Sequence, residues 1–340
     1  MKRLAVADST PSALAALDRA FASGGASELD PSVPAAVWRR ALAGPAMEFL
    51  ARSGKQLRTT IVRAGWVLGG GAPDDLPDGL PLVIELIHAG SLIVDDVEDS
   101  SAERRGAPAL HHLVGVPLAI NTGSWMYFWA LAELAALGLP PAIELAVHRA
   151  ASSTLVRCHQ GQALDLSTRI WDLDPDTVGA VVRATTRLKT GALCTFAAEL
   201  GARAAGAPPA VTAAVRRFGD AMGTGLQMLD DLGSLTSQDR RDKGREDLQG
   251  GRPTWPWAWL AESHGFAWSR CVAMARHVAD GADEVDALAD TLCDAIAVRG
   301  RARVRATLDG AMADLVSTVG TSSTIEGIAG ELARMEASYG

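Results

Sequence analysis

Two acidic clusters hold the residues best suited to chemistry in this sequence. The first is Asp95-Asp96-Val97-Glu98-Asp99, and the second is Asp230-Asp231, which Ser234 follows. Each ends an apolar stretch of helical character, where carboxylates are costly unless their charge is compensated. Residues four apart share one face of a helix, so Asp95 and Asp99 can direct their oxygens to one point. Such clusters suit Mg²⁺, which binds a few carboxylates and fills its other positions with water or phosphate.

Two adjacent arginines, Arg104 and Arg105, follow the first cluster. Arginine binds the oxygens of a diphosphate in a bidentate manner, so this pair suits a phosphorylated ligand next to the metal site. An acidic run by itself is more often a solvated helix end. The arginines favour a site that holds a phosphorylated substrate through metal ions.

Helices are the elements that must position these residues. The stretch from Leu82 to Val94 is apolar on nearly all sides, which is typical of a central helix surrounded by others. A second apolar stripe recurs at steps of three or four, at Val215, Phe218, Met222, Leu226 and Leu229. Convincing strand patterns are absent and the connections are short. We predict an all-α protein with one large helical domain over residues 36–340, preceded by an extension or first helix over residues 1–35.

Composition narrows the functional classes. The chain has 340 residues, 48 % of them hydrophobic, which is enough for a large core. Its formal net charge of -8 argues against a nucleic-acid partner. The cysteines Cys158, Cys194, Cys271 and Cys293 are scattered, as in proteins of a reducing compartment.

The sequence also argues against export and membrane insertion. The first apolar run ends at Asp8, which is too early for a signal peptide. Glu85 and His88 interrupt the best candidate for a membrane span. We therefore expect a soluble, cytoplasmic protein.

Several motifs in order make the chain resemble the trans-isoprenyl diphosphate synthases, the polyprenyl synthetase family. Within that family it is most similar to the eukaryotic type of geranylgeranyl diphosphate synthase. The resemblance runs from about Gly54 to Trp257. Besides the two acidic clusters, it rests on Ile120–Phe128, His159–Asp165, Lys189-Thr190-Gly191 and Gln227. It implies a single helical bundle with a central active-site cavity, and a homodimer.

The resemblance implies roles for the acidic residues. Asp95, Asp96 and Asp99 would bind Mg²⁺ on one side of an allylic diphosphate, and Asp230 and Asp231 would bind it on the other side. Three Mg²⁺ ions would be present with substrate bound.

The resemblance also implies roles for basic and polar residues. Arg104 would contact the allylic diphosphate. Lys189, Thr190 and Gln227 would lie near the reacting carbons and stabilise charge there. A metal-free site for isopentenyl diphosphate would be formed by Gly54, Lys55, Arg58, His88 and Arg105. Taken singly, each could be a surface charge or a satisfied core group, and their joint occurrence is what favours the functional interpretation.

Some positions depart from the family pattern. Ser234 stands where many relatives have Asp, and the eukaryotic-type subgroup also lacks that carboxylate. Lys243 precedes Asp247 by one residue fewer than usual, which puts its diphosphate-binding role in doubt. Trp255, Trp257 and Trp259 are bulkier than expected, and core packing is the default explanation.

The length of the product depends on the depth of the pocket. Gly90 and Ser91 are small and precede the first cluster by about one helical turn, so they would not stop a growing chain. The large Trp125, Tyr127 and Phe128 lie where the subgroup places its pocket floor. A floor at that depth favours a C20 product, geranylgeranyl diphosphate.

The predicted function is Mg²⁺-dependent head-to-tail condensation of isopentenyl diphosphate with an allylic diphosphate. Departure of diphosphate leaves an allylic cation, so the site must stabilise the leaving anion and exclude water without offering a nucleophile.

Two other functions stay open. A class I terpene cyclase on the same fold would use one C15 or C20 prenyl diphosphate, but it needs no isopentenyl diphosphate site. A non-catalytic subunit of a prenyl synthase would be expected to lose carboxylates of the first cluster, which this chain keeps.

Overall fold

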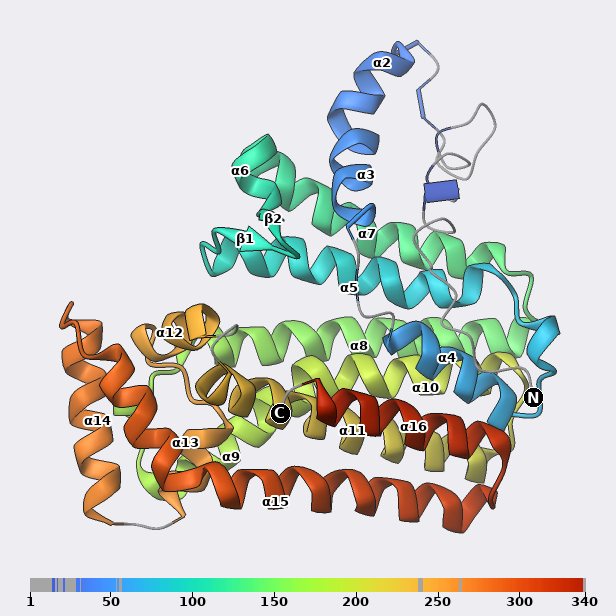
Figure 1. The fold of residues 1–340 in the computed structure, drawn as a ribbon. Coiled ribbons are helices and arrows are strands. Elements are labelled where there is room, and N and C mark those ends of the chain that lie inside the picture. Colours follow the sequence, from blue (N-terminus) through green and yellow to red (C-terminus); the bar gives the residue numbers. More distant parts are fainter. Residues whose placement is uncertain are drawn as a thin grey trace. The chain divides into compact units, whose positions relative to one another are not determined.

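The structure is a computed structural model that shows an almost entirely helical protein (Figure 1). It describes residues 14, 15, 17, 21, 29, 30, 32–52, 54, 57–237, 241–262 and 265–338, without the side chains of residues 241–243 and 297. The only strands in this described part are β1 (Glu103–Arg104) and β2 (Ala107–Pro108), which form one antiparallel hairpin. The predicted all-α class is confirmed.

The chain divides into two compact units. The first contains residues 1–152 and 196–212, and the second contains residues 153–195 and 213–340. Three helices contribute residues to both units: α8 (Pro141–Ser167), α10 (Ala192–Ala204) and α11 (Pro209–Thr236). The sequence predicts a single domain over residues 36–340. Most of the N-terminal segment predicted over residues 1–35 lies outside the described residues.

The first unit contains the first acidic cluster. Its remaining helical elements are α2 (Ala35–Trp38), a π-helical segment (Arg39–Ala43), α3 (Gly44–Leu50), α4 (Leu57–Leu68), a 3-10 turn (Pro73–Asp75), α5 (Gly79–Glu98), α6 (Leu110–Val114) and α7 (Val116–Ala136). Helix α5 is buried on several sides, as its apolar sequence predicts. Leu82, Leu86 and Ile93 are among its most deeply buried residues.

Helices α5 and α7 run side by side in close contact (Figure 1). Two glycines allow this approach, because a Cβ atom added at Gly90 would lie 2.6 Å from the carbonyl oxygen of Gly123. A Cβ atom at Gly123 would lie 2.9 Å from the carbonyl oxygen of Gly90. The small residues therefore fix the helix that carries the first cluster firmly against its neighbour.

The second unit contains the second acidic cluster, on α11. Its other elements are a 3-10 turn (Ile170–Asp172), α9 (Pro175–Thr186), a π-helical turn (Arg187–Gly191), α12 (Arg241–Gln249), α13 (Trp255–Ala261), α14 (Phe266–Ala279), α15 (Val285–Val319) and α16 (Ser323–Ala337). Val215, Phe218 and Met222 of the predicted stripe on α11 are buried.

Tryptophans fill the core around α13, as the sequence analysis expects. Trp255, Trp257 and Trp259 are all buried. The ring of Trp257 meets that of Trp268 on α14 edge to face, with centroids 6.0 Å apart. Helix α13 is thereby fixed against α14, and it also packs on α9 and α15.

Membrane insertion through a helix finds no support in the described residues, because none of their helices is both long and apolar enough to cross a bilayer.

Candidate active site

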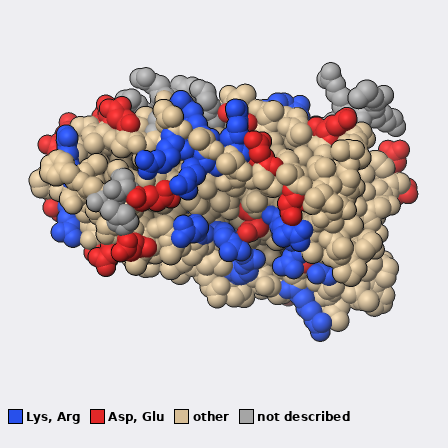
Figure 2. Space-filling model, turned by 90° about the horizontal axis from the view of Figure 1, so that it is seen from below, with Lys and Arg blue, Asp and Glu red and all other residues tan. Residues whose placement is uncertain are grey.

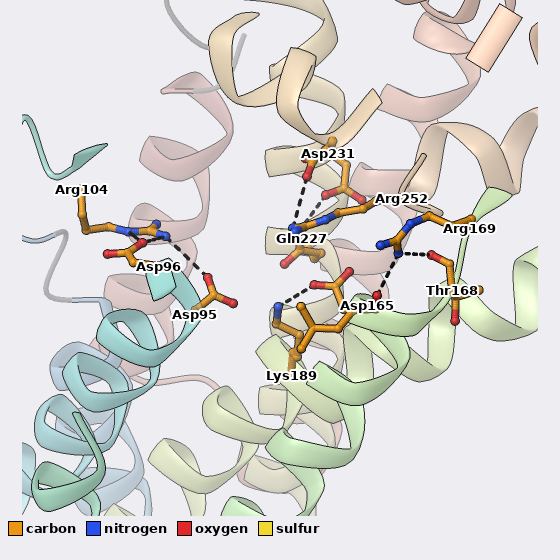
Figure 3. A network of polar contacts seen from close by, with 12 residues as sticks. Asp95, Asp96, Arg104, Asp165, Thr168, Arg169, Lys189, Gln227, Asp231 and Arg252 are labelled. Atoms are coloured by element: carbon orange, nitrogen blue, oxygen red, sulfur yellow. Dashed lines mark hydrogen bonds and ion pairs between the residues drawn. The ribbon is translucent and has the colours of Figure 1, made fainter. Parts of the chain in front are cut away.

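The first acidic cluster is joined to the hairpin arginine Arg104 (Figure 3). Asp96 is fully buried, and its Oδ1 accepts a hydrogen bond of 2.7 Å from Nε of Arg104. Nη2 of Arg104 also lies 3.5 Å from Oδ2 of Asp95. Burial raises the pKa of Asp96, and its bond to Arg104 opposes that rise. Arg104 thus bridges two neighbouring carboxylates.

The C-terminus of α5 orients the last residue of the cluster. Ser100 adopts a left-handed conformation (φ 54°), and the amide of Ser101 donates to the carbonyl oxygen of Asp96 at 2.9 Å. This pattern is a Schellman motif, in which glycine is more usual at the left-handed position. This motif ends α5 at Glu98, and Asp99 is the C-cap residue, one turn beyond Asp95.

A cluster of basic side chains occupies the same unit. Nδ1 of His88 is buried without a hydrogen-bond partner, and so is Nε of Arg58. The pKa of His88 is held well below its usual value, first by burial and then by the charges of Arg58, Arg105 and Arg104. His88 is therefore neutral at pH 7, and the positive charge of the cluster comes from the arginines.

Arg105 and Gly54 are neighbours, as the predicted isopentenyl diphosphate site requires. A Cβ atom added at Gly54 would lie 3.1 Å from Nη2 of Arg105, so glycine leaves room for this guanidinium. Lys55, the other predicted member of this motif, lies outside the described residues. Burial lowers the pKa of Arg105 from its usual value, with Glu85 opposing this and Arg58 adding to it.

The hairpin that carries both arginines turns through Arg105 and Gly106. Both have positive φ values, 55° and 73°. A two-residue turn of this kind matches the twist of antiparallel strands. Arg52, which the sequence analysis does not single out, braces the hairpin by donating to the carbonyl oxygens of Arg104 and Pro108. A single arginine after an apolar helix gives no sequence signal for such a role.

In the second unit, Lys189 forms an ion pair with Asp165 (Figure 3). Nζ of Lys189 lies 2.7 Å from Oδ2 of Asp165 on α8. Lys189 itself lies in the π-helical turn Arg187–Gly191, a type of distortion that is frequent at functional sites. Asp165 belongs to one of the resembling motifs, although the sequence analysis assigns it no role.

A chain of hydrogen bonds links the predicted polar residues of this unit. The hydroxyl of Thr190 donates to Oε1 of Gln227 at 2.7 Å, and Nε2 of Gln227 donates to Oδ1 of Asp231 at 2.7 Å. The backbone N–H of Trp255 donates to Oδ2 of Asp231 at 2.9 Å. The indole of Trp255 donates in turn to Oγ1 of Thr186. Trp255 therefore takes part in the site as well as in the core.

Asp231 lies in the middle of this chain. Burial raises the pKa of Asp231 to about 7, and the two bonds from Trp255 and Gln227 oppose that rise. Both of its carboxylate oxygens accept hydrogen bonds from the protein. Its neighbour Asp230 is more exposed.

The side chain of Ser234 is not in the position expected of a residue that replaces a metal-binding carboxylate. Its side chain is buried, and its hydroxyl donates to the carbonyl oxygen of Asp231 at 2.7 Å. A Cβ atom at Gly244 would collide with the Ser234 backbone, so α12 packs directly on this position. The side chain of Lys243 lies outside the described residues.

The acidic residues of the first cluster could supply some of the oxygen ligands of a Mg²⁺ ion. Asp95 and Asp99 are partly exposed and offer only oxygen ligands. Among the described residues, no group of three or more His, Cys, Asp and Glu could hold a metal ion. Mg²⁺ commonly binds one or two carboxylates and completes its shell with water and substrate phosphates. A pair such as Asp95 and Asp99 suits that mode of binding.

The predicted floor residues on α7 differ in their surroundings. The ring of Tyr127 lies against α5, since a Cβ atom at Gly90 would be 3.1 Å from its Cε1 atom. Trp125 is partly buried and stacks on Trp129 with ring centroids 4.8 Å apart. Phe128, in contrast, is 69 % exposed in the single chain.

One face of the molecule carries charged side chains of both signs. Figure 2 shows several groups of Lys and Arg with Asp and Glu between them on the face that it presents. The described part of this face therefore carries mixed charge, unlike the continuous basic surface that nucleic acid binds.

Comparison with known proteins identifies the family. Residues 39–285 match the polyprenyl synthetase family. Geranylgeranyl pyrophosphate synthase 2 of Zymoseptoria tritici is 31 % identical over 225 residues, which are 63 % of each chain. A geranylgeranyl pyrophosphate synthase of Fusarium fujikuroi is 31 % identical over 220 residues, which are 63 % of this chain and 49 % of that one. The match thus spans less than two thirds of these relatives.

Solved structures show the same fold. A geranylgeranyl pyrophosphate synthetase from the archaeon Geoglobus acetivorans superposes with a TM-score of 0.76, at 21 % identity, over 97 % of this chain and 98 % of that one. A heptaprenyl diphosphate synthase from Staphylococcus aureus gives a TM-score of 0.77 at 18 % identity, over 96 % of each chain. The sequence match and the shared fold agree with the predicted resemblance, and the chain belongs to the polyprenyl synthetase family.

Proposed function

We propose that the protein is a Mg²⁺-dependent prenyltransferase that joins isopentenyl diphosphate head to tail to an allylic diphosphate. The family and the names of its relatives support this activity. The observation that supports it is two differently built groups of charged residues in the first unit, each suited to an anion. One combines Arg104 with the carboxylates of Asp95 and Asp96, and the other combines arginines with a neutral histidine.

The first site is the one suited to the allylic diphosphate. Asp95 and Asp99 would hold Mg²⁺ there, and Asp230 would do so in the second unit. Bound Mg²⁺ would neutralise the diphosphate and make it a better leaving group. The buried Asp96 instead holds Arg104 in place, and Asp231 holds Gln227. We therefore assign these two aspartates to orientation, although the sequence analysis groups them with the metal ligands.

The second site is suited to isopentenyl diphosphate, which must bind without ionising. Arg58 and Arg105 supply positive charge, and neutral His88 can accept or donate a hydrogen bond. Arg58, His88 and Arg105 include no carboxylate pair like Asp95 and Asp99 that could hold Mg²⁺. The arginines would therefore bind the diphosphate directly. The two substrates would thus be distinguished by their need for metal.

The polar groups of the second unit are suited to stabilising positive charge on carbon. The Thr190 hydroxyl donates to the Gln227 side-chain oxygen, which fixes both dipoles before the substrate ionises. The ion pair with Asp165 orients the Lys189 ammonium group. Such preorganised dipoles lower the barrier because they need not reorient during the reaction.

We further propose a C20 product, geranylgeranyl diphosphate. The named relatives support this length. Gly90 itself packs against the backbone of Gly123 on α7, so it does not add space for a growing chain.

We also propose a homodimer. Helix α7 exposes Val116 (45 %), Ile120 (42 %) and Phe128 (69 %) in the single chain. Val116 and Ile120, four residues apart, lie on the same side of the helix, and exposed apolar groups commonly mark an interface.

Product analysis tests the proposed activity. Purified protein is incubated with Mg²⁺ and farnesyl diphosphate, with and without isopentenyl diphosphate. A C20 diphosphate that forms only when both substrates are present is the expected result. A hydrocarbon or alcohol from farnesyl diphosphate alone would identify a cyclase, and absence of turnover would favour a non-catalytic subunit.

A further inference from the structure

Arg52 is a buried cation just beyond the end of α3, and its side chain binds backbone on both strands of the hairpin. Its Nη1 donates to the carbonyl oxygen of Arg104 at 3.1 Å, and its Nη2 donates to the carbonyl oxygen of Pro108 at 2.9 Å. Arg104 belongs to β1 and Pro108 to β2. One guanidinium group therefore ties both strands to the end of α3.

The hairpin needs such support from outside. Each strand has only two residues, and an isolated two-stranded hairpin is marginally stable at best. The turn also places Arg105, which is not a glycine, at a φ of 55°. A left-handed conformation is unfavourable for a residue with a side chain. The conformation that presents Arg105 therefore depends on contacts beyond the hairpin itself.

Arg105 also forms a hydrogen bond with Arg52, at its backbone. Its Nη1 donates to the carbonyl oxygen of Arg52 at 3.3 Å. The Phe49 ring centroid lies 5.5 Å from the guanidinium carbons of both Arg52 and Arg105. Arg104 has a separate anchor, the buried carboxylate of Asp96. Loss of the Arg52 side chain leaves the bond from Arg105 to the Arg52 backbone in place, but it frees the Arg104 carbonyl, which belongs to the peptide unit that joins Arg104 to Arg105. The side chain of Arg104 keeps its bond to Asp96, so Arg105 should be disturbed more than the Arg104 side chain.

Arg52 lies near other arginines. Its positive charge is one of those that lower the pKa of Arg105, after burial and the charges of Arg58 and Arg104. The side chain of Glu48, 3.4 Å away, is 51 % exposed, and an ion pair with such a group contributes little. The two hydrogen bonds to the hairpin are therefore the main polar contacts that the guanidinium group of Arg52 provides.

We propose that Arg52 is a positioning residue that fixes the hairpin so that Arg105 can bind the metal-free diphosphate. This inference rests on the proposed function, in which Arg105 binds isopentenyl diphosphate. Arg52 directs its Nη atoms to the hairpin backbone, so it acts on this substrate through Arg105.

The test compares Arg52→Met, which keeps the bulk of the side chain but removes its donors, with two other variants. Arg52→Met should raise the KM for isopentenyl diphosphate about tenfold, the effect of losing about one hydrogen bond to a charged group. The KM for farnesyl diphosphate should change by less than about twofold. Arg52→Lys, whose single ammonium cannot span both carbonyls, should recover only part of the loss. Glu48→Gln removes the nearby carboxylate without touching the hairpin and should behave like the wild type.

Two further measurements separate positioning from general damage. Calorimetry with isopentenyl diphosphate and metal-free protein should show the same loss of affinity as the KM. Hydrogen exchange without ligand should be faster at the hairpin amides of Arg52→Met. If Arg52→Met does not fold, Arg52→Lys is compared with the wild type in the same assays.

An unchanged KM for isopentenyl diphosphate would overturn the inference, and so would an equal rise for both substrates. If the wild type binds no isopentenyl diphosphate, the proposed function fails instead. In that case the hydrogen exchange measurement still decides whether Arg52 fixes the hairpin, since unchanged exchange would refute it.

Discussion

Adjacent aspartates have different surroundings in both acidic clusters. Asp96 is buried against Arg104, whereas the side chain of Asp95 is 21 % exposed. Asp231 is buried and accepts hydrogen bonds from Gln227 and Trp255, whereas Asp230 is more exposed. Neighbouring residues on a helix point in directions about 100° apart, so one of each pair faces the protein interior. The more exposed member is the better metal ligand, and the buried member orients another side chain.

Substitutions in the two kinds of aspartate should therefore differ in their metal dependence. Asp95→Asn should raise the Mg²⁺ concentration needed for half-maximal activity by about tenfold or more, because a ligand loses its charge. Asp231→Asn offers one acceptor oxygen in place of two, so it should lower kcat about tenfold by loosening Gln227 while the Mg²⁺ requirement stays the same. Steady-state rates across a Mg²⁺ titration provide the measurement. A matching rise in the Mg²⁺ requirement for both variants would show that Asp231 is a ligand after all.

His88 should make stability depend on pH. Its pKa in the folded protein lies well below the usual value, so below about pH 6.5 the unfolded chain gains a proton that the folded chain does not. The free energy of unfolding should therefore fall as the pH falls, by at most about 1.4 kcal/mol per pH unit. His88→Asn should show a shallower fall. Urea midpoints between pH 7 and pH 5 measure both slopes, and equal slopes would contradict the assignment.

Close helix packing holds the first cluster in place. Gly90 and Gly123 allow α5 and α7 to approach so closely that an added Cβ atom at either would meet the carbonyl oxygen of the other, at 2.6 Å and 2.9 Å. Backbone atoms cannot move aside as a flexible side chain can. The helix that carries Asp95 is therefore fixed by contacts one turn earlier in its own sequence.

Alanine substitutions at two helical glycines should have opposite effects. Gly90→Ala should destabilise the protein by about 1–3 kcal/mol, because the contact with α7 must open. Gly310 in α15 has no atom within 4 Å of an added Cβ atom. Gly310→Ala should therefore stabilise by up to about 1 kcal/mol through helix propensity alone. Thermal or urea unfolding of both variants measures the difference, and equal effects would show that the α5–α7 contact yields easily.

Sequence patterns predict some of these elements and miss others for physical reasons. The apolar stretch from Leu82 to Val94 predicts α5 because burial on all sides leaves a continuous signal. The hairpin at Arg104 and Arg105 is not predicted from the sequence, since two-residue strands are too short for any periodic pattern. The π-helical turn at Lys189 is a local distortion of helical sequence, and the pattern of residue types does not mark it.

At the scale of the whole molecule, long-range partners are what the sequence conceals. Arg52 meets Arg104 across 52 residues and Trp255 meets Asp231 across 24, and neither pair has a spacing that predicts contact. The motif resemblance predicts the family and the helical fold because several short segments recur in order. It leaves Arg52 and Trp255 without a role, because neither belongs to the residues that carry the resemblance. The division into two compact units also has no marker in the sequence, since the connections are uniformly short.

Assembly is the prediction that belongs to this scale. The wild type should be a dimer in solution, and Phe128→Asp should shift it toward monomer because a charge would be buried at the interface. Phe266→Asp is the matched control, since Phe266 on α14 is 84 % exposed and lies in the other unit. Light scattering coupled to gel filtration measures the mass. A monomeric wild type, or equal behaviour of the two variants, would remove α7 as an interface.

The most direct test of the account is calorimetric binding of each diphosphate with and without Mg²⁺. A non-reactive analogue of farnesyl diphosphate and isopentenyl diphosphate itself are titrated separately into the protein, first in Mg²⁺ and then in a chelator. The account predicts that the analogue loses most of its affinity in the chelator, whereas isopentenyl diphosphate binds about equally well in both. Equal dependence of the two ligands on Mg²⁺ would contradict the existence of two differently built sites.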